Sequence, residues 1–600
     1  MVSLKARAAT ISAGLLMALA GLNPVLADVP AVMDRVPGNA AIIITVRDMQ
    51  QFSSRFEDLA KAIKAPMDEN DDENPIAMTK KLLAVDGLNK HGSLAVTMVP
   101  GQDGKVDFEQ EGGPVVIVVP VSDYATFAKA LGATDTTGVS EVKIKDEPAF
   151  AKDLGGGFAA LSPHKELVEA FEGKAGHMDK HKSNLGKNGN QIADGSDLMV
   201  VFSVEALKPQ MEEGVAQMKE QFNNMGAMAG PEAEQAQAAF DMVTTLADSF
   251  VRDAQVAVVG LGLGDAGVSL DFGAQYKEGT PSAKVLSSDG AAGKFLSRVP
   301  NQPFLFAMAM DLTAPGIKQL VKDMGAMSEK SGKDSPFTGM GGMGVLSKTI
   351  DKVDGNAAVL GASPAGIMGL FANMVTYTAT SDPEGYMKAA RETLTSMDGK
   401  DLQGIKAKVD YAPASVDVAG LKADTWSFQL QPDANNPAAG QIQMVMGVMF
   451  GQGGLNGMTA AVDHGVVSTL SQNSPLFTKA VEAAKSGKGL SDDEQIKAVQ
   501  EHLPASRTFE MYLGTKSILD AVGAAMGMFG GGVELKVPDK VSPVGMGAST
   551  QGGGMDFRVY VPHDVIKTIA DIGESMKKPP ADEEAPANNN NGEKPKTPKF

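Results

Sequence analysis

The same short order of turn, strand and helix start occurs twice in this chain. Residues 36–49 read Val-Pro, a short turn, an apolar run and an Asp, and residues 299–312 repeat this order with the same spacing from Val-Pro to Asp. An apolar run between turn residues indicates a buried strand, and an Asp directly after it is a typical helix N-cap. This repeat constrains the fold most, because it predicts that one structural unit is present in two copies.

Four further pairs of segments follow in the same order along the chain. They are residues 122–130 with 381–389, 157–163 with 465–471, 198–204 with 508–514, and 259–272 with 544–557. The first three pairs indicate strands beside helix starts, with Ser162 and Ser471 as helix N-caps. The last pair predicts two closing β-hairpins with turns at 264–267 and 551–554. The turn and helix signals common to all α/β chains are the alternative explanation of these matches.

The repeat predicts an α+β fold with two tandem copies, each a mostly antiparallel sheet with helices packed on one face. Adjacent strands joined by short Gly-rich turns favour this arrangement over a parallel sheet. We expect the first copy over residues 28–285 and the second over 286–576. The first copy should contain a helical hairpin insertion at 205–250, and the second a Met- and Gly-rich insertion at 314–345.

The N-terminus has the three parts of a secretory signal peptide. Lys5 and Arg7 precede the apolar run 8–22, and a small-residue cleavage site ends at Ala27. The apolar run is shorter than the roughly 20 residues that a spanning helix needs, so we expect cleavage, with a retained anchor as the alternative. The mature protein is therefore expected to be soluble, without a transmembrane segment, and either periplasmic or secreted.

The chain is acidic, with a formal net charge of −19 at pH 7, and it has no Cys. A negative surplus repels phosphate backbones, so we do not expect a nucleic-acid partner. The lack of Cys excludes disulfides and a lipid-modified cysteine. We expect an acidic solvated loop at 68–74 and a disordered tail at 577–600.

Two apparent catalytic motifs are better explained by structural roles. Residues 262–267 fit the dinucleotide pattern G-x-G-x-x-G, but an alternating strand pattern follows where a helix is required, which favours a hairpin turn. Ser162 and Lys165 fit the S-x-x-K motif of penicillin-binding enzymes, and residues 471–473 and 485–487 resemble its partner motifs. Ser162 and Ser471, however, hold equivalent places in different copies. We therefore assign no catalytic residue and no cofactor.

Possible metal ligands are also explained more simply. His177 and His181 are spaced i, i+4, but their surroundings are polar and a third ligand is missing, so a solvated pair is expected. Residues 68–72 have the acidic spacing of an EF-hand without its loop Gly. Four M-x-x-M motifs begin at Met225, Met324, Met340 and Met446. Thioethers bind Cu(I), but the same spacing follows from any apolar helix stripe, so we assign no metal site.

At its two Val-Pro, strand and Asp openings, the chain resembles a loosely defined group of exported bacterial proteins from planctomycete-like genomes. The resemblance covers residues 36–576. The group has no assigned activity or site residues, so the resemblance implies no catalytic or binding role for any residue.

The apolar stripes of the inserted helices lead to the functional hypothesis. We expect a non-enzymatic binding or interaction protein that presents Met-rich amphipathic helices to a protein partner or a hydrophobic ligand. The candidate hydrophobic surface consists of Met211, Met218, Phe222, Met225, Met228, Met324 and Met327. The alternative is a hydrolase with dispersed catalytic residues, for which His164, His464 and His563 are the candidates. The oligomeric state is left open.

Overall fold

The computed structural model describes residues 29–65, 75–100, 106, 113–144, 147–226, 233–331, 343–363, 369–401, 405–432, 439–451, 454–528 and 535–577. The expected signal peptide, the acidic loop 68–74, the tail from residue 578 and most of the glycine-rich part of the second insertion lie outside these residues.

The described strands form one continuous sheet of 19 strands in which all neighbours are antiparallel. The first half of the chain supplies β1 (Ile42–Val46), β2 (Leu94–Met98), β3 (Val115–Pro120), β4 (Val139–Ile144), β5 (Glu147–Gly155), β6 (Phe158–Ser162), β7 (Leu198–Ser203), β8 (Ala254–Gly264) and β9 (Gly267–Tyr276). The second half supplies β10 (Phe304–Asp311), β11 (Val353–Gly361), β12 (Met374–Thr380), β13 (Ile405–Val418), β14 (Leu421–Pro432), β15 (Leu455–Val462), β16 (Gly465–Thr469), β17 (Phe509–Leu513), β18 (Val544–Gln551) and β19 (Gly554–Pro562).

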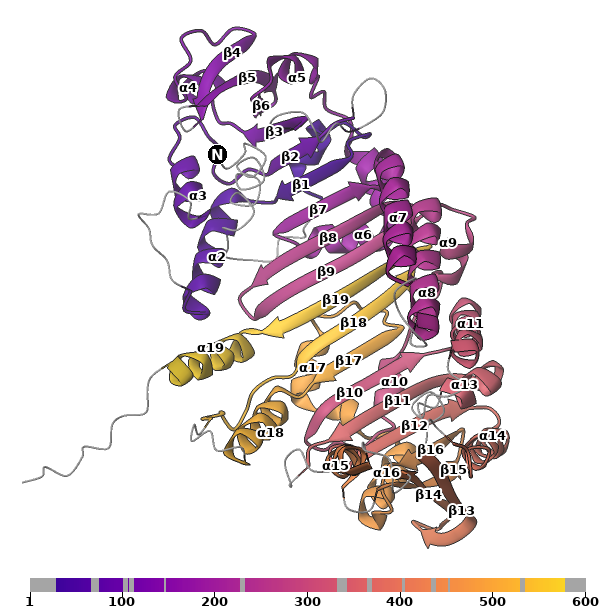
Figure 1. Ribbon diagram of the computed structural model, residues 1–600. Coiled ribbons are helices and arrows are strands. Elements are labelled where there is room, and N and C mark those ends of the chain that lie inside the picture. The colour runs from indigo at the N-terminus through magenta and orange to yellow at the C-terminus, as the bar shows by residue number, and fades with distance from the viewer. Residues whose placement is uncertain are drawn as a thin grey trace, which may run out of the picture.

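The pairings place the strands of the first half in the order β4–β5–β6–β3–β2–β1–β7–β8–β9. The second half continues the sheet as β19–β18–β17–β10–β11–β12–β16–β15–β14–β13 (Figure 1). In each half the first strand lies between the second strand and a late strand, β7 or β17. Each half then ends in a hairpin, β8–β9 or β18–β19.

The mixed α+β class and the large antiparallel sheet agree with the sequence prediction, but the expectation of one sheet for each copy is wrong. The last strand of the first half, β9, pairs along its length with the last strand of the second half, β19. Phe272 lies opposite Phe557, and Leu270 lies opposite Val559. Since both strands would otherwise be open sheet edges, their pairing satisfies the backbone groups that an edge leaves exposed.

The two predicted hairpins are confirmed. Gly264 pairs with Gly267 at the end of β8–β9, and Gln551 pairs with Gly554 at the end of β18–β19. The G-x-G-x-x-G segment is therefore a hairpin turn followed by a strand, without the helix N-terminus that would bind a pyrophosphate.

The helix starts are only partly as predicted. Asp48 caps α2 (Met49–Ala62) by accepting a hydrogen bond from the backbone N–H of Gln51 at 2.7 Å. The two serines predicted as N-caps do not have that role. The hydroxyl of Ser162 donates to the carbonyl of Val115 in β3, and α16 is capped by Asn473 instead of Ser471. Ser162 is the last residue of β6, and its hydroxyl bonds across to the neighbouring strand instead of to a helix.

Helices cover both sides of the sheet, so the prediction of helices on one face is wrong. We call the side covered by α6 (Met178–Gly195) the back and the opposite side the front; α6 lies behind the strands in Figure 1. On the back, α5 (Lys165–Ala170) and α6 pack on the first half, and α10 (Gly293–Leu296), α16 (Ser474–Ser486) and α17 (Glu494–Gln500) pack on the second. On the front, α2 and α4 (Tyr124–Ala130) cover the outer strands of the first half through Phe52 and Phe127.

The remaining helices connect or flank these layers. In the first half they are η1 (Ala31–Arg35), α3 (Pro75–Leu83), α7 (Val204–Gly226), α8 (Ala233–Asp253) and α9 (Pro281–Val285). In the second half they are α11 (Pro315–Ser331), α13 (Met343–Thr349), η2 (Ile350–Lys352), α14 (Pro383–Thr395), α15 (Ala439–Phe450), η3 (Leu490–Asp492), α18 (Thr515–Met528) and α19 (His563–Lys577). The predicted helical hairpin insertion is confirmed as α7 and α8, whose Phe222 and Phe240 rings stack with centroids 3.8 Å apart.

The back helix α6 lies unusually close to the sheet at two glycines. A Cβ atom at Gly260 in β8 or at Gly273 in β9 would come within 2.6 and 2.4 Å of Ile192, which is fully buried. Because glycine has no side chain, these positions let the helix approach the strands that meet the second half.

Buried charges mark the junction of the two halves on the back of the sheet. Arg558 in β19 donates to the carboxylate of Asp271 in β9 at 2.5 Å, and Asp271 is 0% exposed. Asp556 lies on the same side, two residues before Arg558, and is 1% exposed. Burial, and then the charge of Asp271, raise the pKa of Asp556 to about 7.

This raised pKa predicts a pH dependence of folding. In the unfolded chain Asp556 ionises near pH 4, whereas in the folded protein it holds its proton up to about pH 7, so its contribution to the free energy of unfolding falls as pH rises from about 4 to 7. Asp556→Asn should flatten this decline, measured by urea unfolding at a series of pH values. Asp417→Asn, an exposed carboxylate paired with Lys422, should leave it in place. Equal slopes for Asp556→Asn and the unmodified protein would contradict the assignment.

Candidate functional site

The front of the central strands is apolar although it is not covered by other parts of the described chain. Along β8, β10, β17 and β18, buried residues alternate with half-exposed ones. In most antiparallel sheets the solvent-facing positions of such a pattern are polar. Here they are occupied by Val, Leu, Phe, Met and Ala.

We call this surface the apolar floor and define it by the front residues of six neighbouring strands. They are Ala257, Val259 and Leu261 in β8, Leu270 and Phe272 in β9, Met555, Phe557 and Val559 in β19, Met546 and Ala548 in β18, Phe509, Met511 and Leu513 in β17, and Phe306 and Met308 in β10. Leu270 and Phe272 are 38% and 42% exposed. The six strands span about 24 Å, since neighbouring strands lie ~4.8 Å apart.

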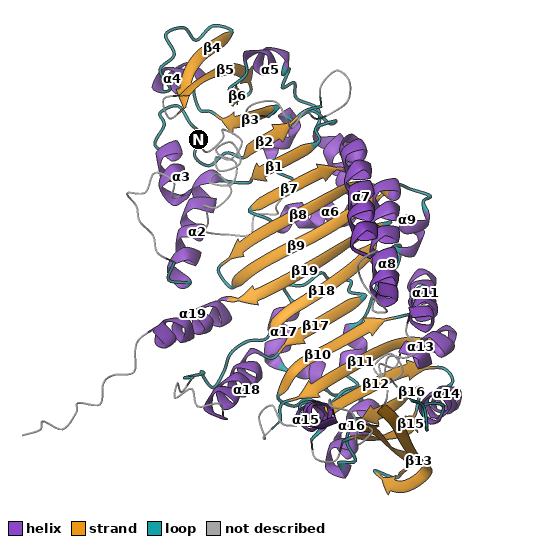
Figure 2. Cartoon of the chain, viewed as in Figure 1, coloured by secondary structure: helices purple, strands orange, loops and turns teal. Residues whose placement is uncertain are grey.

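Helices stand along both ends of these strands, as Figure 2 shows, and leave the middle of the front uncovered. On one side are α2, α18 and α19, and on the other are α8 and α11. Among the described residues, the exposed large apolar side chains away from the floor are Ile63, Val243, Leu246, Leu320, Met444, Val522, Ile569 and Met576. Apart from Met444 in α15, all of them belong to these flanking helices or, for Ile63, to the end of α2. The floor and its flanks therefore concentrate the exposed apolar surface of the described chain.

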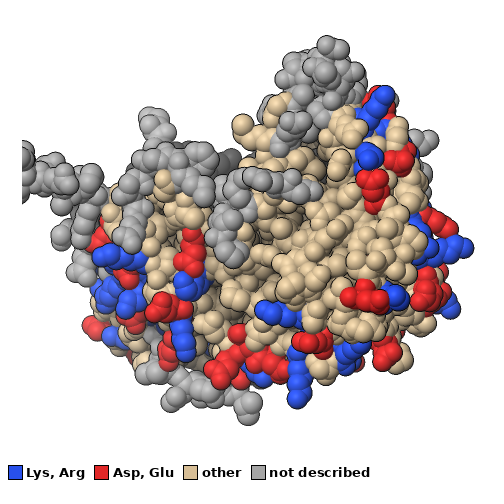
Figure 3. Space-filling model, turned by 90° about the horizontal axis from the view of Figure 1, so that it is seen from below, with Lys and Arg blue, Asp and Glu red and all other residues tan. Residues whose placement is uncertain are grey.

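Charged side chains are unevenly distributed over the end face of the described molecule. In Figure 3 the molecule is seen from the end where β13 lies, and Lys, Arg, Asp and Glu gather toward the lower rim and the two sides of the view. A broad tan area between them carries few charges. This view shows the floor edge-on, and none of the front residues that define the floor is Lys, Arg, Asp or Glu, as expected for a surface that binds an apolar ligand.

An apolar cavity adjoins one end of the floor. It has a volume of about 620 Å³ and lies between the front of β10, β11 and β17 and one side of α18. Phe306 and Leu513 of the floor line it together with Ile518, Ala521 and Ala525 of the helix. None of the described residues that line this cavity is polar.

Only part of the Met-rich surface predicted from the sequence lies within the described residues. Met211 packs into a small cluster with Ala41, Val106 and Leu207, and Phe222 stacks on Phe240 between α7 and α8. Met218 is half-buried on α7. The side chains of Met225, Met324 and Met327 and all of Met228 lie outside the described residues. The apolar stripes that the sequence indicated thus serve partly to join α7 to its neighbours.

The sequence reasoning missed the floor itself. Its signal was present in the strands β8 and β10, whose apolar residues occupy consecutive positions instead of alternating with polar ones. Such a run is typical of a strand buried on both sides. A strand with one open face that is equally apolar has the same sequence pattern, so the pattern does not distinguish the two cases.

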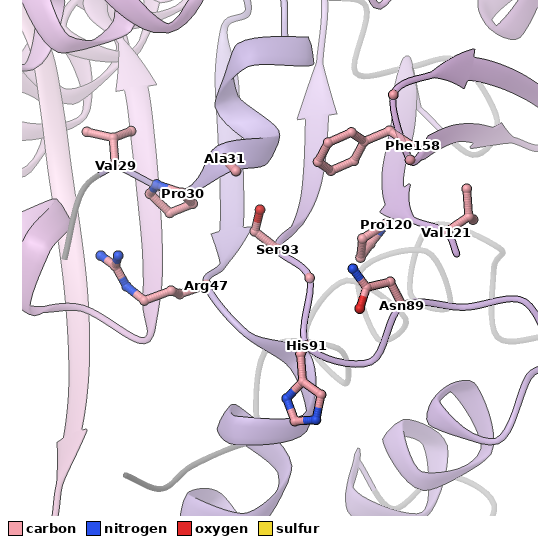
Figure 4. Close-up of a pocket in the computed structure, with 13 residues that line it drawn as sticks. Val29, Pro30, Ala31, Arg47, Asn89, His91, Ser93, Pro120, Val121 and Phe158 are labelled. Atoms are coloured by element: carbon pink, nitrogen blue, oxygen red, sulfur yellow. The ribbon is translucent and has the colours of Figure 1, made fainter. Parts of the chain in front are cut away.

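A second, polar pocket of about 320 Å³ lies beside η1 and is lined by Arg47, Asn89, His91, Ser93 and Phe158 among others (Figure 4). Its polar groups are engaged in local structure. Arg47 donates to the carbonyls of Ala193 and Ser196 at the end of α6, and the hydroxyl of Ser93 accepts from the backbone N–H of Val32 at 2.8 Å.

This pocket does not assemble a nucleophile and a base. His91 Nδ1 lies 3.2 Å from Asp48, which also caps α2. Figure 4 shows the His91 ring pointing away from the Ser93 hydroxyl, on opposite sides of the same segment. A Ser-His pair within hydrogen-bond reach, which hydrolysis by this route requires, is not formed there.

The three histidines proposed for a hydrolase belong to different elements and have backbone roles. The N–H of His164 before α5 bonds to Ser162, His464 forms the β15–β16 turn with φ 61°, and the N–H of His563 at the start of α19 bonds to the carbonyl of Ala266. The structure does not bring them together.

The predicted solvated pair His177 and His181 is wrong for its second member. His181 is 4% exposed, and its Nε2 lies 2.9 Å from the carbonyl of Val36. Burial lowers the pKa of His181. Within the described residues, no group of three or more His, Asp or Glu could hold a metal ion. Met446, in the one M-x-x-M motif whose side chains are described, packs beside a cluster that contains Trp426.

No protein-family model, no curated protein and no solved structure matches this chain. Its function has to be inferred from its own surface. In the part of the chain that the structure describes, no helix has both the length and the apolar composition needed to cross a bilayer.

The same Val→Thr substitution, made separately at a back position and a front position of β8, tests whether the front is open. Val258 faces α6 and is 1% exposed, whereas its neighbour Val259 faces the front and is half-exposed. Val258→Thr should lower the free energy of unfolding by about 2 kcal/mol, because it buries a hydroxyl among apolar side chains. Val259→Thr should change it by less than about 0.5 kcal/mol. Urea unfolding measures both, and a large loss for Val259→Thr would mean that the front is covered.

Proposed function

We propose that this is an exported, non-enzymatic binding protein that holds an elongated apolar ligand on the apolar floor. The observation that carries the proposal is the composition of the floor: its solvent-facing residues are apolar on six successive strands. Leaving such an area in water is unfavourable by roughly 25 cal/mol per Å², and covering it with an apolar ligand recovers that free energy.

A small apolar ligand fits the floor better than a protein partner. The residues that carry most of the binding energy in protein interfaces are enriched in Tyr, Trp and Arg, and the floor has none of these. Ligand sites are concave and mainly apolar, as expected for a sheet flanked by helices on two sides. In the sequence-based hypothesis, Met-rich helices formed the binding surface. In the present proposal the floor forms this surface, and the flanking helices form its two sides.

The site would be built from two copies of one unit. The two halves share a strand order around β1 and β10, and each ends in a hairpin whose last strand reaches the junction. Both halves then supply strands of the floor, two from the first half and four from the second, with Phe272 opposite Phe557. Two such units joined at their last strands make the binding surface longer than either could alone.

The export part of the proposal rests on the signal-peptide pattern of residues 1–27. When the full gene is expressed in a bacterium, the protein should be recovered outside the cytoplasm and should begin at Asp28. Intact-mass measurement of the purified protein checks this. A protein that still carries residues 1–27 would show that the leader is retained.

Ligand binding is tested by placing a charge in the middle of the floor. Phe272→Lys and Phe557→Lys should each weaken binding of the apolar dye Nile red at least tenfold, because a charged side chain must be desolvated under the ligand. As equivalent positions of two copies, they should weaken it by similar factors. Fluorescence titration gives the dissociation constants, and circular dichroism checks folding.

Met444→Lys is the matched control, since Met444 is 71% exposed on α15, away from the β9–β19 junction. It should leave dye binding unchanged. Equal binding by all three variants would refute the floor as the site, and a large effect of one phenylalanine alone would speak against two equivalent copies.

A further inference from the structure

We infer that the cavity beside α18 binds the end of a single hydrocarbon chain, so that the ligand class is a lipid with at least one fatty acyl chain. This inference rests on the proposed function, because the cavity is treated as one end of the apolar floor. Its basis is the size, the lining and the position of the cavity.

The size of the cavity suits a small ligand. At about 620 Å³ it falls within the range of roughly 300–1,000 Å³ that small-molecule sites occupy. An α-helix with side chains is about 10–12 Å across, and only a few of its residues would fit into such a volume. A helix from a partner is therefore a poor occupant.

The lining excludes most other ligands. The residues around the cavity, such as Leu360, Leu370 and Phe371 opposite Ile518 and Met526, offer only apolar atoms. An extended peptide would bring N–H and C=O groups that find no hydrogen-bond partner there, and each such group is costly to bury. A hydrocarbon chain has no polar group to satisfy and can fill the space without this penalty.

The position of the cavity connects it to the floor. Phe306 and Leu513 belong to both, since they face the front of β10 and β17 and also line the cavity. One lipid tail covers about 15 Å, half of a bilayer core of ~30 Å. A chain inserted into the cavity can thus leave it over Phe306 and continue across the strands, with its polar head group outside the cavity.

The helix α18 leaves room for this chain through its small residues. Ala521 and Ala525 line the cavity together with Val522, which is 44% exposed. Larger side chains at the two alanines would fill the space and remove exposed apolar surface. An empty cavity lowers the free energy of unfolding. A ligand that occupies the cavity would explain why these two positions have small residues.

Fatty acids of increasing length test the inference. With the purified protein, calorimetric titration should show the dissociation constant falling about fourfold for each methylene added from C8 to C14, the factor expected for burial of one CH₂. Ala525→Leu should weaken myristate binding at least tenfold and raise the Tm of the ligand-free protein. Ala524→Leu, an exposed neighbour on the same helix, should behave as the unmodified protein.

The outcomes separate this inference from the proposed function. If Ala525→Leu binds myristate normally, or if Phe272→Lys abolishes that binding and Ala525→Leu does not, the cavity is not the chain site, although the floor can still be one. If myristate fails to bind while Nile red does, the cavity is covered by another part of this chain or by a second copy, and the inference falls. Should Ala525→Leu fail to fold, a photoreactive fatty acid must label residues 518–526, and labelling elsewhere overturns the inference.

Discussion

The antiparallel pairing of β9 with β19 is the interaction on which the rest of the structure depends. It joins two sets of strands from opposite halves of the chain into one sheet and removes the one edge, β9 or β19, that each half would otherwise expose there. The buried Arg558–Asp271 pair fixes the register on the back, where Gly273 lets α6 lie close to the strands. Removing one member of such a pair would leave an uncompensated charge in the interior.

The two sides of this junction have opposite character. Ionisable groups are buried on the back, and Phe272 and Phe557 are left half in solvent on the front. Register alone produces this result, because successive residues of a strand face opposite sides. A shift by one residue would bury the phenylalanines and bring Asp271 to the surface, so the position of the apolar floor and the position of the buried charges are set together.

Local features of the fold could be read from the sequence, and the long-range ones could not. The hairpin at Gly264, the cap at Asp48 and the α7–α8 hairpin depend on neighbouring residues, and each was predicted correctly. The joining of β9 to β19 depends on residues nearly half the chain apart, for which no short pattern exists. The apolar floor escaped prediction for another reason. A strand that is apolar on both sides normally has both sides covered, and nothing in the run of Phe306 to Met310 distinguishes a covered side from an open one.

The distance along the chain between β9 and β19 also determines when the molecule can be completed. The hairpin β8–β9 is synthesised long before β19, the strand that pairs with β9. Until nearly the whole second half has been made, β9 is an open edge and Asp271 has no Arg558 to pair with. Contacts of such long range form slowly, and strand edges that are open in the meantime attract other chains. A polypeptide that leaves the ribosome or a translocation channel from its N-terminus would thus need a holding factor or rapid delivery of its last strands to close the sheet without aggregating.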